Sequence, residues 1–362
     1  MFFDILFWVL KKGMVKLKIQ IEIEPITFGE LAEKWYNCEI IDYAYQYSKE
    51  IKSSINHLNC AFKNTQVTEI KFEDVKEFIA RRYKYNPNTG RIMSKSLISN
   101  IIDIGSRIFE FGIDNDYAYR NPFHNKKRLI PKNATNRIRE PINDTQIEYI
   151  ISTQHRAQNL SIIMLFCGLR LGEALCLNWQ DIDFSSKQIS VIKSLERINT
   201  NAFQIKPHTK NKKDRYVPIP DKICDYLYKQ RTEVVGNGLI CSQLNGKLHT
   251  LTSYQQMWNS YQTELNFHYY CDYQKKLGKN CISKFSPNGF PHMLPRFTAH
   301  QLRHTYCTML YFAGVDVLTA SKLMGHSSVD ITLRIYTHLD EKFKQYNISK
   351  FNEYVKNLPI TF

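Results

Sequence analysis

The chain has 362 residues, which at about 150 residues per domain predicts two or three domains. Its 43% hydrophobic content excludes a disordered chain, and its 14 glycines and 12 prolines exclude a collagen-like or low-complexity one. Lys and Arg number 49 against 34 Asp and Glu, a net charge of +15 that favours a polyanionic partner, above all nucleic acid.

The chain opens with the apolar run MFFDILFWVL, which contains Asp4 and precedes Lys11 and Lys12. A signal peptide carries its lysines before the apolar run, and this run is too short to span a membrane. We therefore interpret residues 1–25 as an N-terminal extension, with translation beginning at Met14, and expect no membrane partner. The nine scattered cysteines predict a cytoplasmic protein with reduced thiols.

Residues 26–124 are typical of a helical module. Thr27 and Glu30 have the spacing of a capping box, and apolar residues recur at helical spacing after them. Residues 125–142 combine prolines with crowded positive charges and predict a basic interdomain linker. A basic segment of this kind can bind a DNA phosphate backbone. The alternative interpretation is an ordinary solvated loop. The residues expected to bind DNA are Lys126, Lys127, Arg128, Lys132, Arg137 and Arg139.

Helical periodicity resumes at residue 143. Two alternating stretches, KQISVIKS and RYVPIP, lie on either side of the charged turn KNKKDR and predict a small antiparallel sheet between helices. Helical patterns return after residue 221 and continue into a tail, 340–362, whose apolar stripe needs a groove to cover it. The expected fold class is mainly α with a small antiparallel β-sheet, an α+β protein.

Six polar residues stand in the apolar segments of this second half. The first two are three positions apart and share a helix face, as do the next two. The tyrosine comes ten residues after the last histidine, which itself follows a glycine. The six residues are, in chain order, Arg170, Glu173, His300, Arg303, His326 and Tyr336.

These side chains suit chemistry at a phosphodiester. Two guanidiniums can fork onto the non-bridging oxygens and stabilise a pentacoordinate transition state. A tyrosine hydroxyl becomes a nucleophile when cationic neighbours and a histidine acceptor activate it, and a lysine can protonate the departing sugar oxygen. The set lacks the carboxylate cluster of a two-metal nuclease, so we expect neither a metal nor a cofactor.

The segments GLRLGE, AHQLRHTY, GHSS and IYTH resemble those of the tyrosine recombinase family, the phage and transposon integrases, most clearly from Phe166 to Leu339. In that family the catalytic lysine lies in a β-hairpin, and the segment TKNKKDRYVPI matches it best at Lys210, with Lys212 and Lys213 as rivals. We interpret Glu173 as a partner of a guanidinium, with a helix surface charge as the alternative. The catalytic set that the resemblance implies is Arg170, Lys210, His300, Arg303, His326 and Tyr336.

The resemblance also implies a domain order and an activity. Residues 26–124 would be a core-type DNA-binding domain and 143–339 the catalytic domain, closing as a C-shaped clamp on double-stranded DNA. Tyr336 would form a 3′-phosphotyrosyl link during site-specific recombination and integration. Four protomers would form the synapse, with the tail, 340–362, docked on a neighbour, and a directionality factor or DNA-bending host protein would assist. Residues 1–25 are short for an arm-type domain and would be a remnant of one.

Three alternatives remain open at this point. A zinc site could be formed by His268, Cys271, Cys281 and His292, but their spacing is loose and contains no C-x2-C knuckle. A type IB topoisomerase would share the arginine, lysine, histidine and tyrosine chemistry without exchanging strands between duplexes. A DNA-binding regulator that has lost catalysis would lack the tyrosine or an arginine, and neither is missing here.

Overall fold

The computed structural model describes residues 25–85, 90, 92–135, 140–207, 214–232, 238–342 and 348. The chain divides into two compact units, Met1–Arg137 and Ile138–Phe362. Within the described residues no helix is long and apolar enough to cross a membrane.

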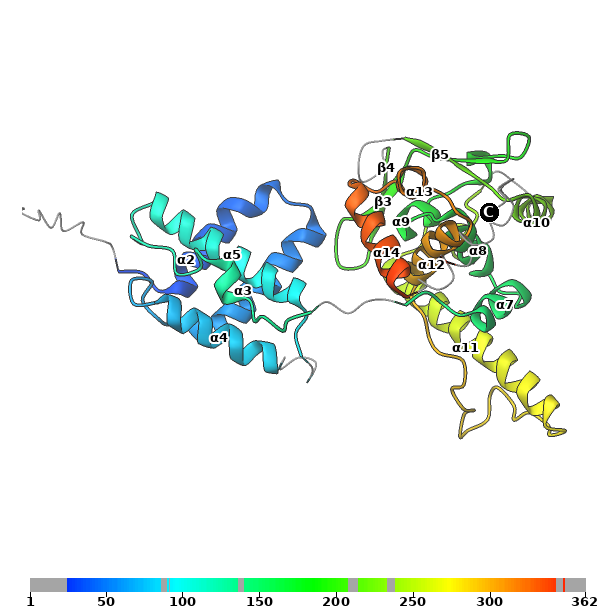
Figure 1. The fold of residues 1–362 in the computed structure, drawn as a ribbon, viewed down its shortest axis with the longest axis horizontal. Coiled ribbons are helices and arrows are strands. Elements are labelled where there is room, and N and C mark those ends of the chain that lie inside the picture. Colours follow the sequence, from blue (N-terminus) through cyan, green and yellow to red (C-terminus); the bar gives the residue numbers. More distant parts are fainter. Residues whose placement is uncertain are drawn as a thin grey trace, which may run out of the picture. The chain divides into compact units, whose positions relative to one another are not determined.

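The first unit is helical throughout its described part (Figure 1). Its elements are α2 (Phe28–Glu39), the short 3-10 helix η1 (Ile40–Asp42), α3 (Tyr45–Phe62), α4 (Phe72–Lys84), α5 (Lys95–Asp114) and α6 (Lys126–Leu129). The predicted capping box is confirmed, since the amide of Thr27 donates to the Glu30 carboxylate over 2.9 Å. Behind this cap, Phe28, Leu31 and Trp35 are buried in the core of the unit.

The start of the expected linker is folded into this unit. Asn125 caps α6, and Leu129 is buried in the same core as Phe28. Lys126 forms an ion pair with Asp103 of α5 over 2.5 Å. One turn of helix holding one buried leucine is too short to show apolar periodicity, so the pattern predicted a linker from residue 125 and was wrong there. The second half of that stretch, with Arg137 and Arg139, lies outside the described residues.

The second unit packs helices around small sheets (Figure 1). Its helices are α7 (Asp144–Ser152), α8 (Gln158–Cys167), α9 (Leu171–Leu175), the 3-10 helix η2 (Trp179–Asp181), α10 (Asp221–Thr232), α11 (Leu251–Lys276), α12 (Ala299–Phe312), α13 (Val317–Met324) and α14 (Val329–Lys342). Its strands are β1 (Ile182–Asp183), β2 (Gln188–Val191), β3 (Ser194–Arg197), β4 (Phe203–Lys206) and β5 (Arg215–Pro218). Of the predicted tail, only the residues up to Lys342 and Ile348 are described.

The antiparallel sheet predicted from the two alternating stretches is confirmed, with one addition. Strands β1, β2 and β5 form an antiparallel sheet in which Ile189 pairs with Val217, and both are fully buried. Between β2 and β5 the chain forms a second antiparallel pair, β3 and β4. The exposed and half-buried residues of that hairpin give no clear alternation, which explains why the pattern predicted a single sheet.

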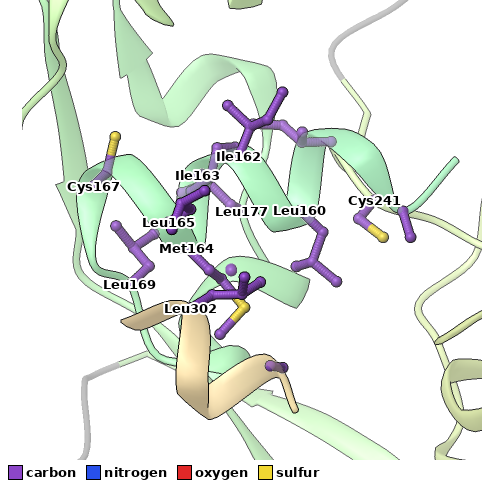
Figure 2. Close-up of a cluster of buried hydrophobic side chains, with 14 of the residues drawn as sticks. Leu160, Ile162, Ile163, Met164, Leu165, Cys167, Leu169, Leu177, Cys241 and Leu302 are labelled. Carbon is purple, nitrogen blue, oxygen red and sulfur yellow. The ribbon is translucent and has the colours of Figure 1, made fainter. Parts of the chain in front are cut away.

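Helix α8 is the centre of the second core. Eight of its ten residues are buried, and α12 packs along it. Figure 2 shows Leu302 of α12 in one cluster with Leu160, Met164 and Leu165 of α8. Because both helices are fixed by this core, the polar residues at the end of α8 and on α12 are held at constant positions relative to each other.

The long connection before α12 is a helix followed by an ordered irregular segment. Helix α11 runs for 26 residues, and residues 277–298 then return to the core without a helix or strand. The side-chain amide of Asn266 holds the returning chain, because it donates to the Pro291 carbonyl and accepts from the amides of Met293 and Leu294, all at 2.8–2.9 Å. Leu294 then enters the core.

Candidate active site

Arg170 is positioned by the turn that ends α8. Gly168 closes that helix in the left-handed conformation, with φ at +66°, and a Cβ there would lie 2.2 Å from the ring of Tyr306. The tight turn brings Arg170 to the N-cap of α9, where its side chain is 26% exposed. Arg170 is therefore the most accessible of the clustered arginines.

Glu173 is buried beneath Arg170 and fixes it twice. One carboxylate oxygen accepts from the Arg170 amide over 2.8 Å, and the other accepts from Nη1 over 2.9 Å. Burial by itself raises the pKa of this carboxyl, but the hydrogen bond and charge of Arg215 and the contacts of Arg170 outweigh it, so the pKa is lowered. Glu173 is thus ionised and, as predicted, is a partner of a guanidinium.

Arg303 lies on α12 and is 2% exposed. Its Nη1 donates to the Gly168 carbonyl over 2.5 Å, and its Nη2 donates to the Met324 carbonyl. Burial first, and then the charge of Arg170, lower its pKa to about 9, so the guanidinium remains protonated at neutral pH. Nη2 of Arg170 donates to the adjacent Gly325 carbonyl. The two arginines therefore converge on the same turn, Met324–Gly325.

His326 follows that turn directly. Its Nδ1 lies 2.7 Å from Oγ1 of the buried Thr332 on α14. Burial lowers its pKa to about 4, assisted by the charges of Arg303 and Arg170, so the imidazole is neutral at pH 7. His300, in the first turn of α12, is exposed and close enough to His326 to contribute to the same shift.

Tyr336 occupies a separate apolar cluster. It is 8% exposed on α14, its ring meets that of Tyr311 edge to face at 5.1 Å, and its hydroxyl donates to the Val315 carbonyl over 3.0 Å. Burial, followed by Cys307 and Asp316, raises its pKa above the ordinary range of tyrosine. The hydroxyl therefore bonds to main chain, and not to Arg170 or Arg303.

The structure contains a third arginine in the cluster, Arg215, which sequence reasoning missed. It opens β5, its side chain is 11% exposed, and its two Nη atoms donate to the two oxygens of Glu173 over 3.0 and 2.7 Å. The available signal is its place at the start of the alternating stretch RYVPIP, directly after a charged turn, but alternation by itself predicts only a strand. Lys210, with its rivals Lys212 and Lys213, lies between β4 and β5, outside the described residues.

A cavity of about 420 Å³ opens beside the cluster. Cationic groups dominate its polar lining, with one carboxylate among them, so it suits an anion of the size of a phosphodiester. The residues that line it are Arg170, Asp214, Arg215, Leu318, Ser321, Lys322, Gly325, His326, Ser327 and Val329.

Three of the four residues of the alternative zinc site have hydrogen-bond or ion-pair partners. His268 lies 3.3 Å from the Glu264 carboxylate, and the thiols of Cys271 and Cys281 are hydrogen-bonded to each other. Among the described residues no group of three or more His, Cys, Asp and Glu side chains could hold a metal ion.

Solved structures of integrases share this fold. The Tn1549 transposon integrase, in complex with a circular intermediate DNA, matches with a TM-score of 0.65 at 20% identity, covering 86% of this chain and 95% of that one. A lambda integrase tetramer bound to a Holliday junction matches with a TM-score of 0.56 at 13% identity, covering 90% and 85%. The helical unit followed by the α+β unit is thus the fold of an integrase, and the predicted fold class is confirmed.

The chain belongs to the phage integrase family, whose model matches residues 140–342. It is 27% identical over 353 residues to the tyrosine recombinase XerC-like protein of Caldanaerobacter subterraneus subsp. tengcongensis, covering 92% of this chain and 85% of that one. It is therefore a site-specific recombinase of the tyrosine type, and the predicted family and enzyme class are confirmed.

Proposed function

We propose that Tyr336 is the nucleophile and that Arg170 and Arg303 hold the non-bridging oxygens of the scissile phosphate. The observation that carries the proposal is the convergence of both guanidiniums on the turn Met324–Gly325, immediately before His326. Arg170, Arg215 at the start of β5, and residues of α13 and the α13–α14 turn line an anion-sized cavity beside this convergence. Double-stranded DNA, the substrate of a site-specific recombinase, supplies that anion.

In this proposal the tyrosine oxygen attacks phosphorus in line with the 5′ oxygen. The bond from phosphorus to the tyrosine oxygen forms as the bond to the 5′ oxygen breaks, which leaves a 3′-phosphotyrosyl link and a 5′-hydroxyl. The tyrosine proton passes to a neutral imidazole, and Lys210 gives a proton to the departing oxygen. His326 is neutral at pH 7 and exposed His300 is beside it, so these two are the candidate acceptors.

Tyr336 has to leave the Val315 carbonyl before it can attack. Its hydroxyl is bonded there and its ring is packed on Tyr311, so the form described is a resting form. We propose that DNA binding shifts this equilibrium towards a form in which the hydroxyl faces the arginine cluster.

The helical unit would carry the core-type DNA-binding function of residues 26–124. Lys127, Arg128 and Lys132 are exposed and available to phosphates, while Lys126 would have to exchange its ion pair with Asp103 for a phosphate. We keep Arg137 and Arg139 in the proposed DNA contact.

We also propose that four protomers assemble in the synaptic complex, a number that matches the lambda integrase tetramer bound to a Holliday junction. Residues 340–362 would dock on a neighbouring protomer, and a directionality factor or a DNA-bending host protein would act with the tetramer. Since DNA is the substrate, we expect the protein to work in the cytoplasm.

A nicked suicide substrate tests the nucleophile. The wild-type protein should form a covalent complex that is resistant to detergent, and Tyr336→Phe should bind the same DNA and form none. Tyr228→Phe, at an exposed position on α10, is the matched control and should behave as wild type. A covalent complex with Tyr336→Phe would overturn the assignment. Exchange of strands between two labelled duplexes, in addition to relaxation of supercoils, separates this function from that of a type IB topoisomerase.

A further inference from the structure

Arg215 is largely buried, and its side chain donates three hydrogen bonds within the site. Its guanidinium approaches Glu173 end-on, with Nη1 donating to Oε1 over 3.0 Å and Nη2 to Oε2 over 2.7 Å. Its Nε donates to the Leu323 carbonyl at the end of α13 over 3.3 Å. One side chain therefore joins β5 to the start of α9 and to the turn that precedes His326.

The approach of Arg215 depends on the residue at position 325. A Cβ at Gly325 would lie 3.0 Å from three atoms of the Arg215 guanidinium, and the φ of this residue is +61°. Only glycine gives both the left-handed turn and the space beside the guanidinium. The turn before His326 is thus shaped to leave room for the Arg215 guanidinium.

The net charge of Glu173, Arg170 and Arg215 together determines how strongly the site attracts a phosphate. Glu173 accepts four hydrogen bonds, two from Arg170 and two from Arg215, and is almost completely buried. If Arg170 were the sole guanidinium on this carboxylate, the pair would be neutral and would attract a phosphate weakly. With Arg215 added, the trio carries one net positive charge, and the more exposed member, Arg170, faces the cavity.

We infer that Arg215 is a positioning residue that neutralises and clamps Glu173, so that the charge of Arg170 is available to the scissile phosphate. This inference rests on the proposed role of Arg170 as a phosphate ligand. It assigns Arg215 no contact with DNA: it acts through Glu173 and through the turn before His326.

The test is a set of substitutions at the two positions, with Tyr336 intact. Removing one partner of a buried pair leaves the other charge uncompensated, and here that charge would pull Arg170 into a neutral pair. Arg215→Gln should therefore slow formation of the covalent complex by about 100-fold, the loss typical of one electrostatic contact to the transition state. Affinity for the DNA site should remain within about twofold of wild type, because phosphate contacts elsewhere dominate binding.

The double variant Arg215→Gln/Glu173→Gln gives a readout that a purely structural arginine would not produce. Removing the buried carboxylate abolishes the competing charge, so the double variant should react about tenfold faster than Arg215→Gln alone. Arg215→Lys keeps the charge without the fork and should react at an intermediate rate. Arg231→Gln, at an exposed position on α10, is the matched control and should react as wild type.

Each outcome decides the question. A wild-type rate for Arg215→Gln, or a double variant no faster than that single variant, would overturn the inference while the wild-type covalent complex leaves the proposed function standing. Failure of the wild-type protein to form the complex would instead defeat the proposed function. If circular dichroism shows that Arg215→Gln does not fold, the rate of Arg215→Lys is compared with that of wild type. Equal rates would overturn the inference, because they would show that the paired hydrogen bonds from the guanidinium to Glu173 are not needed.

Discussion

The hydroxyl of Tyr336 donates a 3.0 Å hydrogen bond to the main-chain oxygen of Val315. This bond, with the edge-to-face contact of Tyr311, holds the proposed nucleophile at the junction of α12 and α13 and away from the guanidiniums. In the proposed mechanism this position would keep Tyr336 from attacking DNA before the site is complete.

Weakening this resting place should accelerate the first chemical step. An aromatic pair contributes about 0.5–1.5 kcal/mol, so Tyr311→Leu should raise the rate of covalent complex formation by about two- to tenfold if release of Tyr336 limits it. Single-turnover assays on a suicide substrate measure this rate. A rate unchanged or lower than wild type, in a folded variant, would show that release of Tyr336 from Tyr311 does not limit formation of the covalent complex.

Cleavage should not require a divalent metal ion. The proposed mechanism stabilises the phosphorane charge with Arg170 and Arg303, so EDTA should leave the rate of covalent complex formation roughly unchanged. The comparison is made on pre-bound DNA, so that a metal effect on binding is separated from one on cleavage. A strict need for Mg²⁺ in the cleavage step would contradict the assignment.

Arg303→Lys should be a severe substitution despite keeping the charge. Arg303 donates to the carbonyls of both Gly168 and Met324 through separate Nη atoms, and a single ammonium cannot make this fork and also bind two phosphate oxygens. We expect cleavage to fall by about 100-fold or more with DNA binding retained. The exposed position Arg334 offers a matched Arg→Lys control, which should cleave at the wild-type rate. Near-normal cleavage by Arg303→Lys would mean that charge alone suffices.

His326 should make stability depend on pH. Its pKa is about 4 in the folded protein, because of burial and the nearby guanidiniums, against an ordinary value of 6.5. Below the ordinary pKa the unfolded chain takes up the proton first, so stability is lost as pH falls from about 6.5 towards about 4 and is fully present above that window. Urea unfolding of wild type and His326→Gln at pH 7 and pH 5 measures the effect. The difference in unfolding free energy between the two proteins should shrink at pH 5, and a constant difference would refute the shift.

Gly168→Ala should destabilise the protein more than an equivalent change elsewhere. Gly168 has a φ of +66° and would bring a Cβ to 2.2 Å from Tyr306, whereas Gly246 has a φ of +75° with open space around it. Left-handed strain alone predicts about 1 kcal/mol for Gly246→Ala. Overpacking adds to this, so we expect about 3 kcal/mol for Gly168→Ala in urea denaturation. Equal losses would mean that Tyr306 can move aside.

The polar residues of the site could be predicted because each stands in a short apolar segment at fixed spacing. Arg170 with Glu173 and His300 with Arg303 lie three apart on helices, and the structure keeps those helices. Arg215 could not be identified in this way, since it opens a strand and becomes part of the site only because β5 pairs with β2 and so fixes its position beside α13.

The orientation of the Tyr336 hydroxyl could not be predicted from the sequence either. Its hydroxyl partner is a main-chain oxygen, which every residue possesses, so no residue type marks Val315 as the acceptor. Helix α6, at the start of the expected linker, could not be predicted for a related reason. The single buried Leu129 of α6 is fixed by tertiary contacts with α4 and α5, and one leucine shows no period. The roles of Lys210 and of residues 340–362 stay predictions.

The hydrogen bonds of the Asn266 side chain with Pro291, Met293 and Leu294 have a practical use for protein engineering. This amide and the contact of Phe290 with Phe267 anchor the returning segment, and within the largely exposed stretch from Gly278 to Gly289 the residues Ile282 and Lys284 also contact α11. Neither glycine has a neighbour within 4 Å of where a Cβ would stand. We therefore expect an epitope or a small fluorescent reporter inserted next to either glycine to leave the core intact, which would allow individual recombinase molecules to be followed on DNA.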